Sequence, residues 1–306
     1  MRSYRYLHYD VFTDRAFAGN QLAVFLDGRG LAAATMQTIA KEMNFSETTF
    51  VLPPEAKGHG HVDVRMRIFT PGSELPMAGH PTIGSTFALA RSGVIEPGRE
   101  RFVFGLGIGP VPVALSWKGD DLRFVWMTQL KPTFGDPIPE PARAAAALSL
   151  SAAAVSGTSK PVQVVSCGVP FLFVPLATRR AVDSAVLNRA EYDSLLQSAG
   201  TKANGVFLFT AERGPERATV YSRMFAPDLG VVEDPATGSA SGPLGCYLVR
   251  HKIVKPEKAG AMVSLQGVKM GRPSEIHISI GMHGNDISSV QVGGASVLAG
   301  EGTLYV

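Results

Sequence analysis

Three polar residues beside two stretches of small residues are the candidates for chemistry in this sequence. Asp234 lies in the stretch of residues 233–242, and His80 lies in the stretch of residues 78–82. Glu47 lies at the corner between an expected helix and the strand that follows it. Each small-residue stretch is followed by a more apolar segment, so we expect each stretch to begin a helix. The first N–H groups of a helix have no intrahelical partner, which makes such a start a site for a carboxylate or phosphate.

A carboxylate that faces an anion site suggests removal of a proton next to a carboxylate or carbonyl group. This removal puts negative charge onto the oxygens of the substrate, and N–H groups at two helix starts would stabilise that charge. Glu47 would be the base, with a pKa raised if its surroundings exclude water. His80 or Asp234 would carry or orient the second proton. The residues therefore predict proton relocation without a cofactor.

Each of these residues also has a purely structural interpretation, which the residue types leave open. Glu47 could be a solvated acid at a helix C-terminus, although a carboxylate there opposes the helix dipole. Asp234 could be no more than a helix-capping acid. A lone histidine followed by proline, as at His80, is often a turn residue.

The elements that position these residues follow the same order twice along the chain. Residues 67–71 resemble residues 223–227, and an acidic loop with Gly and Pro leads from each to a small-residue helix start. The offset is close to half the chain, which favours an internal duplication over two unrelated α+β domains. Ligands favour clefts between domains, so we expect both helix starts to point into one cleft. Glu47 is not repeated, because the second half has only Ala203 or Asn204 at the expected place.

Hydrophobic periodicity gives the elements of each half. In the first half we expect helices at residues 32–43 and 78–91, and strands at 6–12, 21–26, 49–52, 62–69, 102–115 and 122–127. In the second half we expect helices at residues 142–154, 181–198 and about 237–250, and strands at 162–166, 171–176, 205–210, 219–225, 263–266 and 275–280. Linkers are expected at 131–141 and 156–160. The expected domains are residues 1–128 and 129–287, with a strand in residues 288–306 that returns to the first domain.

Composition excludes several classes of function. The 306 residues are 45% hydrophobic and 18% charged, with a net charge of +3, as expected for a soluble globular protein. Lys and Arg are spread singly, without the clusters that nucleic-acid binding needs. No apolar run is long enough to span a membrane, and the N-terminus lacks the apolar region of a signal peptide. We therefore expect a cytoplasmic protein that binds neither nucleic acid nor membrane, with a small carboxylate-bearing molecule as its partner.

Cofactor and metal motifs are weak. The glycines of residues 105–110 resemble a nucleotide loop, but a strand-like segment follows them instead of a helix. His59 and His61 flank Gly60 in a polar segment, which favours a solvent-exposed loop over a metal site. Two cysteines, Cys167 and Cys246, are too few for a disulfide framework or a thiolate metal site. We expect no cofactor and no metal.

Several of these motifs, taken together and in this order, resemble the phenazine-biosynthesis PhzF-like family. The resemblance covers essentially the whole chain, and its motifs are Tyr9-Asp10-Val11-Phe12-Thr13, Gly19-Asn20, Ser46-Glu47-Thr48, Gly79-His80-Pro81-Thr82, Glu233-Asp234-Pro235-Ala236-Thr237-Gly238-Ser239-Ala240, Gln266-Gly267 and Met270-Gly271-Arg272-Pro273-Ser274.

The resemblance implies an α+β, diaminopimelate-epimerase-like fold of two pseudo-symmetric domains. Each domain would wrap a curved, mainly antiparallel sheet around a central helix, with the active site between the domains. The best-understood member of the family isomerises a dihydro-hydroxyanthranilate without a cofactor. A homodimer is also implied.

Site residues follow from the same resemblance. The general base of the family falls on Glu47, and its substrate-contacting histidine and aspartate fall on His80 and Asp234. Backbone N–H groups of Gly79, Gly238 and Ser239 would bind the substrate carboxylate.

Three functions stay open at this point. The first is an isomerase with Glu47 as base, and the second is a catalytically silent protein that binds a small metabolite or partner. The third is a glutamate-based epimerase. Related racemases use two cysteines at the glycine-rich helix starts, and this chain has no thiol there, so a two-thiol racemase is disfavoured.

Overall fold

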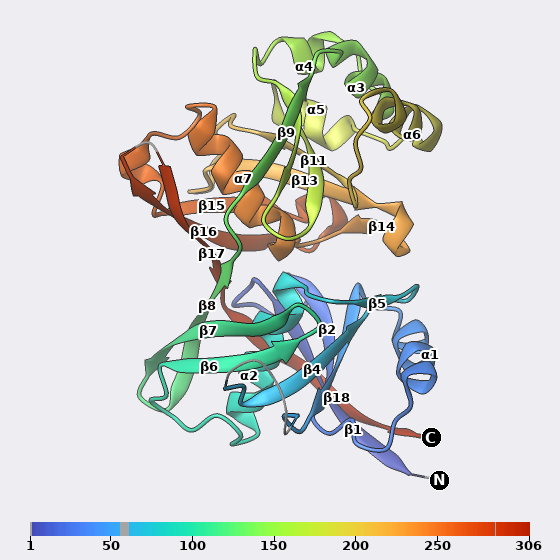
Figure 1. Cartoon of the computed structure of the whole chain (residues 1–306), viewed down its shortest axis with the longest axis vertical. Helices are drawn as coiled ribbons and strands as arrows, with labels where there is room; N and C mark the ends of the chain where they lie inside the picture. Colours follow the sequence, from blue (N-terminus) through green and yellow to red (C-terminus); the bar gives the residue numbers. More distant parts are fainter. Residues whose placement is uncertain (1, 56–60, 285) are drawn as a thin grey trace. The chain divides into compact units, whose positions relative to one another are not determined.

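The computed structural model describes residues 2–55, 61–284 and 286–306, which form two compact units (Figure 1). One unit is Met1–Thr128 with Val292–Val306, and the other is Gln129–Gln291. None of the helices in the described ranges has the length and hydropathy of a membrane-spanning segment.

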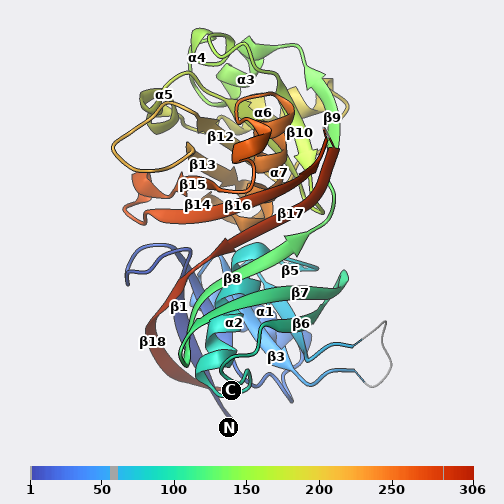
Figure 2. The same ribbon diagram turned by 90° about the vertical axis from the view of Figure 1, so that its left-hand side faces the viewer.

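The first unit contains two helices and a curved sheet in its described residues. Its elements are β1 (Ser3–Val11), β2 (Asn20–Phe25), α1 (Ala33–Met43), β3 (Glu47–Leu52), β4 (Val64–Phe69), β5 (Glu74–Leu75), α2 (Gly79–Arg91), β6 (Arg101–Leu106), β7 (Gly109–Lys118), β8 (Asp121–Gln129) and β18 (Ser296–Tyr305). β1 pairs antiparallel with both β2 and β18, and Figure 2 shows β18 alongside β1. β2 and β3 are parallel neighbours.

The central helix of the first unit is α2, which the strands of that unit surround (Figure 1). All residues from 79 to 89 are buried, so the helix is enclosed on every side rather than on one stripe. Small side chains permit this close packing. A Cβ atom on Gly84 would lie only 2.6 Å from side-chain carbons of both Leu22 and Val11.

The second unit has its own central helix, α7 (Gly238–Arg250), of which residues 240–249 are buried. The other elements are β9 (Thr133–Ile138), α3 (Pro141–Ala147), α4 (Ala153–Ser156), β10 (Val162–Ser166), β11 (Pro170–Pro175), α5 (Arg179–Ser184), α6 (Arg189–Ser198), β12 (Val206–Thr210), β13 (Val220–Ala226), β14 (Val231–Asp234), β15 (Met262–Gln266), β16 (Ser274–His283) and β17 (Asp286–Gly294). One core of this unit packs around α7, and a second lies beneath helices α3–α6.

The two units repeat the same strand pairings. Thr48 lies opposite Phe69 in the antiparallel pair β3–β4, and Val206 lies opposite Phe225 in the antiparallel pair β12–β13. Because residues 67–71 match residues 223–227, the residue that corresponds to Glu47 is Gly205, not Ala203 or Asn204 as the sequence pattern indicated. The second unit therefore has no acid at this place.

Two long helices expected in the second half are each divided. The prediction of one continuous helix at residues 181–198 is wrong. The chain is extended at Ala185 (φ −63°, ψ 134°), and Asn188 then caps a new helix by accepting from the Glu191 N–H. The helix expected at 142–154 divides into α3 and α4, with Ser149 between them at φ 56°. Ala-rich composition did not reveal these interruptions.

Two other segments differ from expectation. The linker expected at residues 131–141 contains β9, which pairs antiparallel with β10. The strand expected at 102–115 is a hairpin of β6 and β7, whose turn is Gly107-Ile108. The glycine-rich residues 105–110 therefore form a hairpin, as the strand-like residues after them had suggested.

Candidate active site

Glu47, which is partly buried, and His80, which is buried, form a pair in the first unit. Glu47 is the first residue of β3, and His80 is the second residue of α2. The carboxylate Oε2 of Glu47 lies 3.1 Å from Nδ1 of His80, with side-chain exposures of 14% and 3%. The sequence separates these residues, and the packing of α2 against β3 brings them together.

Asn20 completes this cluster. Its Nδ2 lies 3.3 Å from the same Nδ1 of His80, and the Asn20 side chain is fully buried. Nε2 of His80 is also buried and has no hydrogen-bond partner among the residues that the structure describes. Nδ1 of His80 therefore has two neighbours, the carboxylate of Glu47 as a hydrogen-bond acceptor and the amide N–H of Asn20 as a donor.

The protonation state of His80 follows from its surroundings. Burial lowers the pKa of His80 to about 3, and a hydrogen bond with the Gln21 backbone opposes this shift. The imidazole is therefore neutral near pH 7. A neutral imidazole has one protonated nitrogen, so Nδ1 either donates to Glu47 or accepts from Asn20.

The start of α2 contributes main-chain donors beside this pair. Its N-cap is Ala78, which has an apolar side chain and makes no capping hydrogen bond. Gly79 and His80 are the first two helical residues, and their N–H groups have no partner within an α-helix. Pro81 has no N–H to satisfy, which suits the first turn of a helix.

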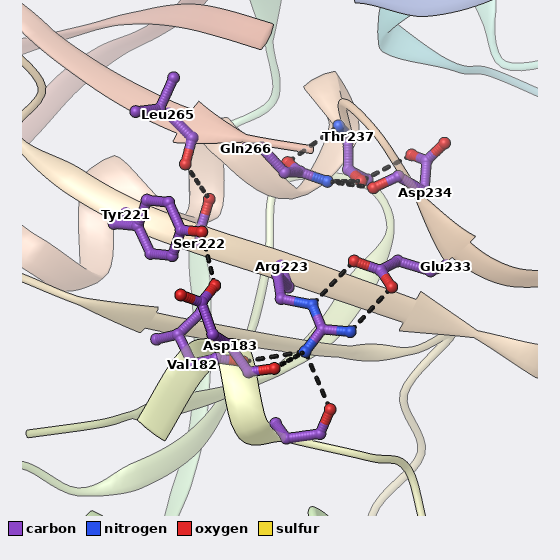
Figure 3. Close-up of polar contacts among 11 residues, drawn as sticks. Val182, Asp183, Tyr221, Ser222, Arg223, Glu233, Asp234, Thr237, Leu265 and Gln266 are labelled. Carbon is purple, nitrogen blue, oxygen red and sulfur yellow. Dashed lines mark hydrogen bonds and ion pairs between the residues drawn. The ribbon is translucent and has the colours of Figure 1, made fainter. Parts of the chain in front are cut away.

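A network of side chains fixes the start of α7 in the second unit (Figure 3). Asp234 ends β14, and its Oδ2 accepts from the Thr237 hydroxyl at 2.6 Å. Oε1 of Gln266 accepts from the Thr237 N–H at 3.1 Å, and Nε2 of Gln266 donates to the Asp234 carbonyl at 2.7 Å. Thr237 is the N-cap of α7 but makes no capping bond, because its hydroxyl is bound to Asp234.

Gly238 and Ser239 are the first two residues of α7, as Gly79 and His80 are of α2. Gln129 donates from Nε2 to the Gly238 carbonyl at 2.9 Å, which also holds this turn in place. Both helix starts therefore present N–H groups without a side-chain cap, which is the geometry of an anion site.

The predicted site residues belong to two groups. The first unit contains Glu47, His80 and Gly79, and the second contains Asp234, Gly238 and Ser239. Sequence reasoning assigned no role in the site to Asn20, Gln266 or Gln129. Asn20 and Gln266 stood only within the family motifs Gly19-Asn20 and Gln266-Gly267, and these motifs were the available signal for them.

No group of three or more His, Cys, Asp or Glu residues in the described part of the chain is arranged to hold a metal ion. His59 lies outside the described residues. His61 is exposed, and its Nε2 lies 3.1 Å from Asp63. Cys167 and Cys246 are both buried, with their Sγ atoms 4.0 Å apart, and neither is at a helix start.

A family model described as "Phenazine biosynthesis-like protein" matches residues 9–302. The chain belongs to this family. Trans-2,3-dihydro-3-hydroxyanthranilate isomerase of Pseudomonas aeruginosa is 36% identical over 304 residues, which cover 99% of this chain and 100% of that family member. The predicted family and the predicted class of enzyme, an isomerase, are therefore confirmed.

Solved structures agree with this family and its fold. A phenazine biosynthesis protein of the PhzF family from Bacillus anthracis matches with a TM-score of 0.85 and 25% identity, covering 100% of both chains. A probable proline racemase from Agrobacterium radiobacter matches with a TM-score of 0.70, covering 99% of this chain and 93% of that chain. At 12% identity the second match concerns the fold alone. The predicted α+β, diaminopimelate-epimerase-like fold is confirmed.

Proposed function

We propose that this isomerase moves a proton next to a carboxylate in a small metabolite, with Glu47 as the base. The observation that carries the proposal is the pair of Glu47 and the buried His80, with 3.1 Å between Oε2 and Nδ1. A carboxylate held in this way is oriented by a neutral group and keeps its capacity to accept a proton.

The neutral imidazole can contact Glu47 before and after the proton transfer without losing its own proton. While Glu47 is ionised, Nδ1 of His80 bears the hydrogen and donates to the carboxylate. Once Glu47 has taken a proton from carbon, the same N–H can donate to an oxygen of the neutral carboxyl group. His80 thus stabilises both states of Glu47 without becoming an imidazolium, which its depressed pKa disfavours.

The substrate carboxylate is bound, in this proposal, by the N–H groups of Gly79, Gly238 and Ser239. Proton removal delocalises negative charge onto that carboxylate, and N–H donors that are already fixed in place stabilise it. Asp234 binds the same substrate, held by its bond from Thr237. Substrate and product are isomers, because Glu47 takes one proton from a first carbon and one proton is returned to a second carbon as the double bond moves.

The first substrate to test is trans-2,3-dihydro-3-hydroxyanthranilate, which the P. aeruginosa family member isomerises. Purified protein is mixed with this compound, and the loss of substrate is followed by ultraviolet absorbance and NMR. Turnover that Glu47→Gln and Asp234→Asn both reduce by orders of magnitude supports the proposal.

A panel of other cyclic and amino carboxylates extends this experiment beyond one substrate. Glu47→Gln is the sharpest variant, because glutamine retains a group that can bond to His80 but cannot take the proton. If the wild type binds a carboxylate without converting or exchanging it, the chain is a binding protein. If it inverts a stereocentre without moving a double bond, the chain is an epimerase.

A further inference from the structure

A cavity of about 820 Å³ lies in the first unit and is lined by residues of β4, β5 and the β6–β7 hairpin. Its polar lining includes Arg65 and Arg67, and its apolar lining includes Leu75 and Ile108. Neither Glu47 nor His80 lines it. The volume is in the range of ligand sites, so the unused hydrogen-bonding groups in the cavity indicate what it binds.

Arg67 has one such unused group. Its Nε and Nη2 donate to the two oxygens of Glu74 at 2.7 and 2.6 Å, while Nη1 has no hydrogen-bond partner among the described residues. Arg65 is similar. Its Nη1 is paired with Glu55, and its Nε is buried without a partner in the part of the chain that the structure describes.

The second unit contains the same arrangement with every group satisfied (Figure 3). Arg223 donates from Nε and Nη2 to Glu233, at 2.8 Å each. Its Nη1 donates to three main-chain oxygens at the end of α5, at distances of 2.9, 3.2 and 2.9 Å: those of Val182, Asp183 and Ala185. The guanidinium therefore binds the C-terminal carbonyls of a short helix.

Two further observations show that Arg67 and Arg223 occupy equivalent positions. Arg67 stacks over the ring of Phe69 at 5.1 Å, and Arg223 stacks over the ring of Phe225 at 4.8 Å. The residue after each arginine pairs with the short strand that follows. Ile68 lies opposite Leu75 of β5, and Met224 lies opposite Asp234 of β14.

Arg65 likewise corresponds to Tyr221. In the parallel pair β4–β6 Arg65 lies opposite Gly105, and in the parallel pair β13–β15 Tyr221 lies opposite Leu265. The Tyr221 hydroxyl donates to Oδ1 of Asp183 at 2.6 Å (Figure 3). Both residues that line the cavity in the first unit thus have counterparts that bind α5 in the second.

The first unit has no counterpart of α5. Between β11 and β12 the second unit has α5 and α6, whereas between β2 and β3 the first unit has only α1. In the second unit α5 lies against Arg223, and the side chain of Val182 in α5 is fully buried. In the first unit the equivalent place is the cavity.

We propose that this cavity binds the C-terminal turn of a short helix from a partner polypeptide, in the way that α5 binds Arg223 and Tyr221. The carbonyls of the partner accept from Nη1 of Arg67, and a side-chain oxygen in the place of Asp183 accepts from Arg65. The charges of Arg65 and Arg67 are already balanced by Glu55 and Glu74, which favours neutral carbonyls at Arg67 over a free carboxylate. The negative end of a helix dipole also suits this place.

The test uses a peptide with the sequence of residues 178–187, acetylated at its N-terminus and amidated at its C-terminus. In the second unit this sequence forms α5 and accepts hydrogen bonds from Arg223. The full ¹⁵N-labelled protein is titrated with this peptide, and the Arg67 Nε–Hε signal and the Gly107 and Gly109 amides are followed by NMR. Saturable shifts of these signals are expected. A peptide with Asp183→Asn should bind several-fold more weakly.

Two protein variants keep the test specific. Ile108 is 50% exposed and lines the cavity, and Val94 is 49% exposed in the same unit and does not line it. Ile108→Ser should weaken peptide binding several-fold, and Val94→Ser should leave it unchanged. The proposal is overturned if the peptide causes no saturable shifts or if a scrambled peptide binds equally well. It is also overturned if benzoate, a free carboxylate, produces the shifts and the peptide does not.

Discussion

At the scale of single residues, the feature that governs the candidate site is the neutrality of His80. Its Nδ1 is in contact with the carboxylate of Glu47, and an imidazolium there would be the ordinary expectation for an ion pair. Burial outweighs this attraction, since it lowers the pKa of His80 to about 3. The imidazole of His80 is therefore uncharged near neutral pH.

This neutrality predicts a pH dependence of stability. The folded pKa of His80 is lower than the unfolded value of 6.5, so the unfolded state gains a proton first as the pH falls. Its contribution to the free energy of unfolding is complete above pH 6.5 and falls steadily toward pH 3. Between pH 7 and pH 5 the loss from His80 alone is about 2 kcal/mol.

Urea unfolding of the wild type and His80→Gln at both pH values measures this loss. The variant should lose less stability than the wild type between pH 7 and pH 5, by about 2 kcal/mol. The other histidines with lowered pKa, His251 and His277, are present in both proteins and cancel. Equal losses in the two proteins would show that His80 is protonated in the folded state.

At the scale of elements, the enclosure of α2 and α7 decides where the site residues stand. Each helix is inserted through the middle of its unit, so its first turn is placed by packing along the whole length. The spacing of small residues predicted both helix starts within a residue or two. Hydrophobic spacing did not predict the break between α5 and α6, because Val182, Ala185 and Leu195 are buried on either side of the extended turn.

Close packing of α2 gives a second prediction. Gly84→Ala adds a methyl group only 2.6 Å from Leu22 and Val11, so overpacking should lower the free energy of unfolding by about 1–3 kcal/mol. Gly300→Ala is the matched control in the same unit, because no atom lies within 4 Å of its added Cβ. Urea unfolding compares the two, and equal stabilities would contradict the packing described for α2.

The start of α7 gives a third prediction, which concerns Gln266. This side chain is fully buried and bonds to Asp234 and twice to Thr237. Gln266→Ala leaves buried main-chain groups without partners and should destabilise the fold by about 1–3 kcal/mol. Gln197→Ala, on the exposed face of α6, should have almost no effect.

Kinetics of Gln266→Ala separate a role in folding from a role at the site. If the start of α7 binds substrate, the folded variant should show a raised KM at a temperature well below its Tm. An unchanged KM would leave Gln266 with a structural role only and would contradict the assignment of Gly238 and Ser239.

At the scale of the whole molecule, two units share one plan and have diverged at a few positions. Glu47 of the first unit has Gly205 in the corresponding place of the second, and Asp234 of the second unit has Leu75 in the corresponding place of the first. Each unit thus holds a different ionisable part of the proposed site. The scaffold repeats, whereas the chemistry does not.

The sequence was informative about this plan for a physical reason. Backbone requirements leave strong local signals, such as the small residues at the starts of α2 and α7 and the alternation in β4. The contacts of Asn20 and Gln266 depend on strand pairing and helix packing between distant segments, and no local pattern specifies them. The same holds for the cavity at Arg65 and Arg67, which exists because one helix of the second unit has no equivalent in the first.

The measurement that tests the central claim most directly is deuterium incorporation from heavy water into a substrate carboxylate or its product, followed by NMR. The wild type should introduce deuterium at the carbon adjacent to the carboxylate, and Glu47→Gln should slow this by at least a factor of about 100. Deuterium entry at the same rate in both proteins would show that another group removes the proton and would contradict the account.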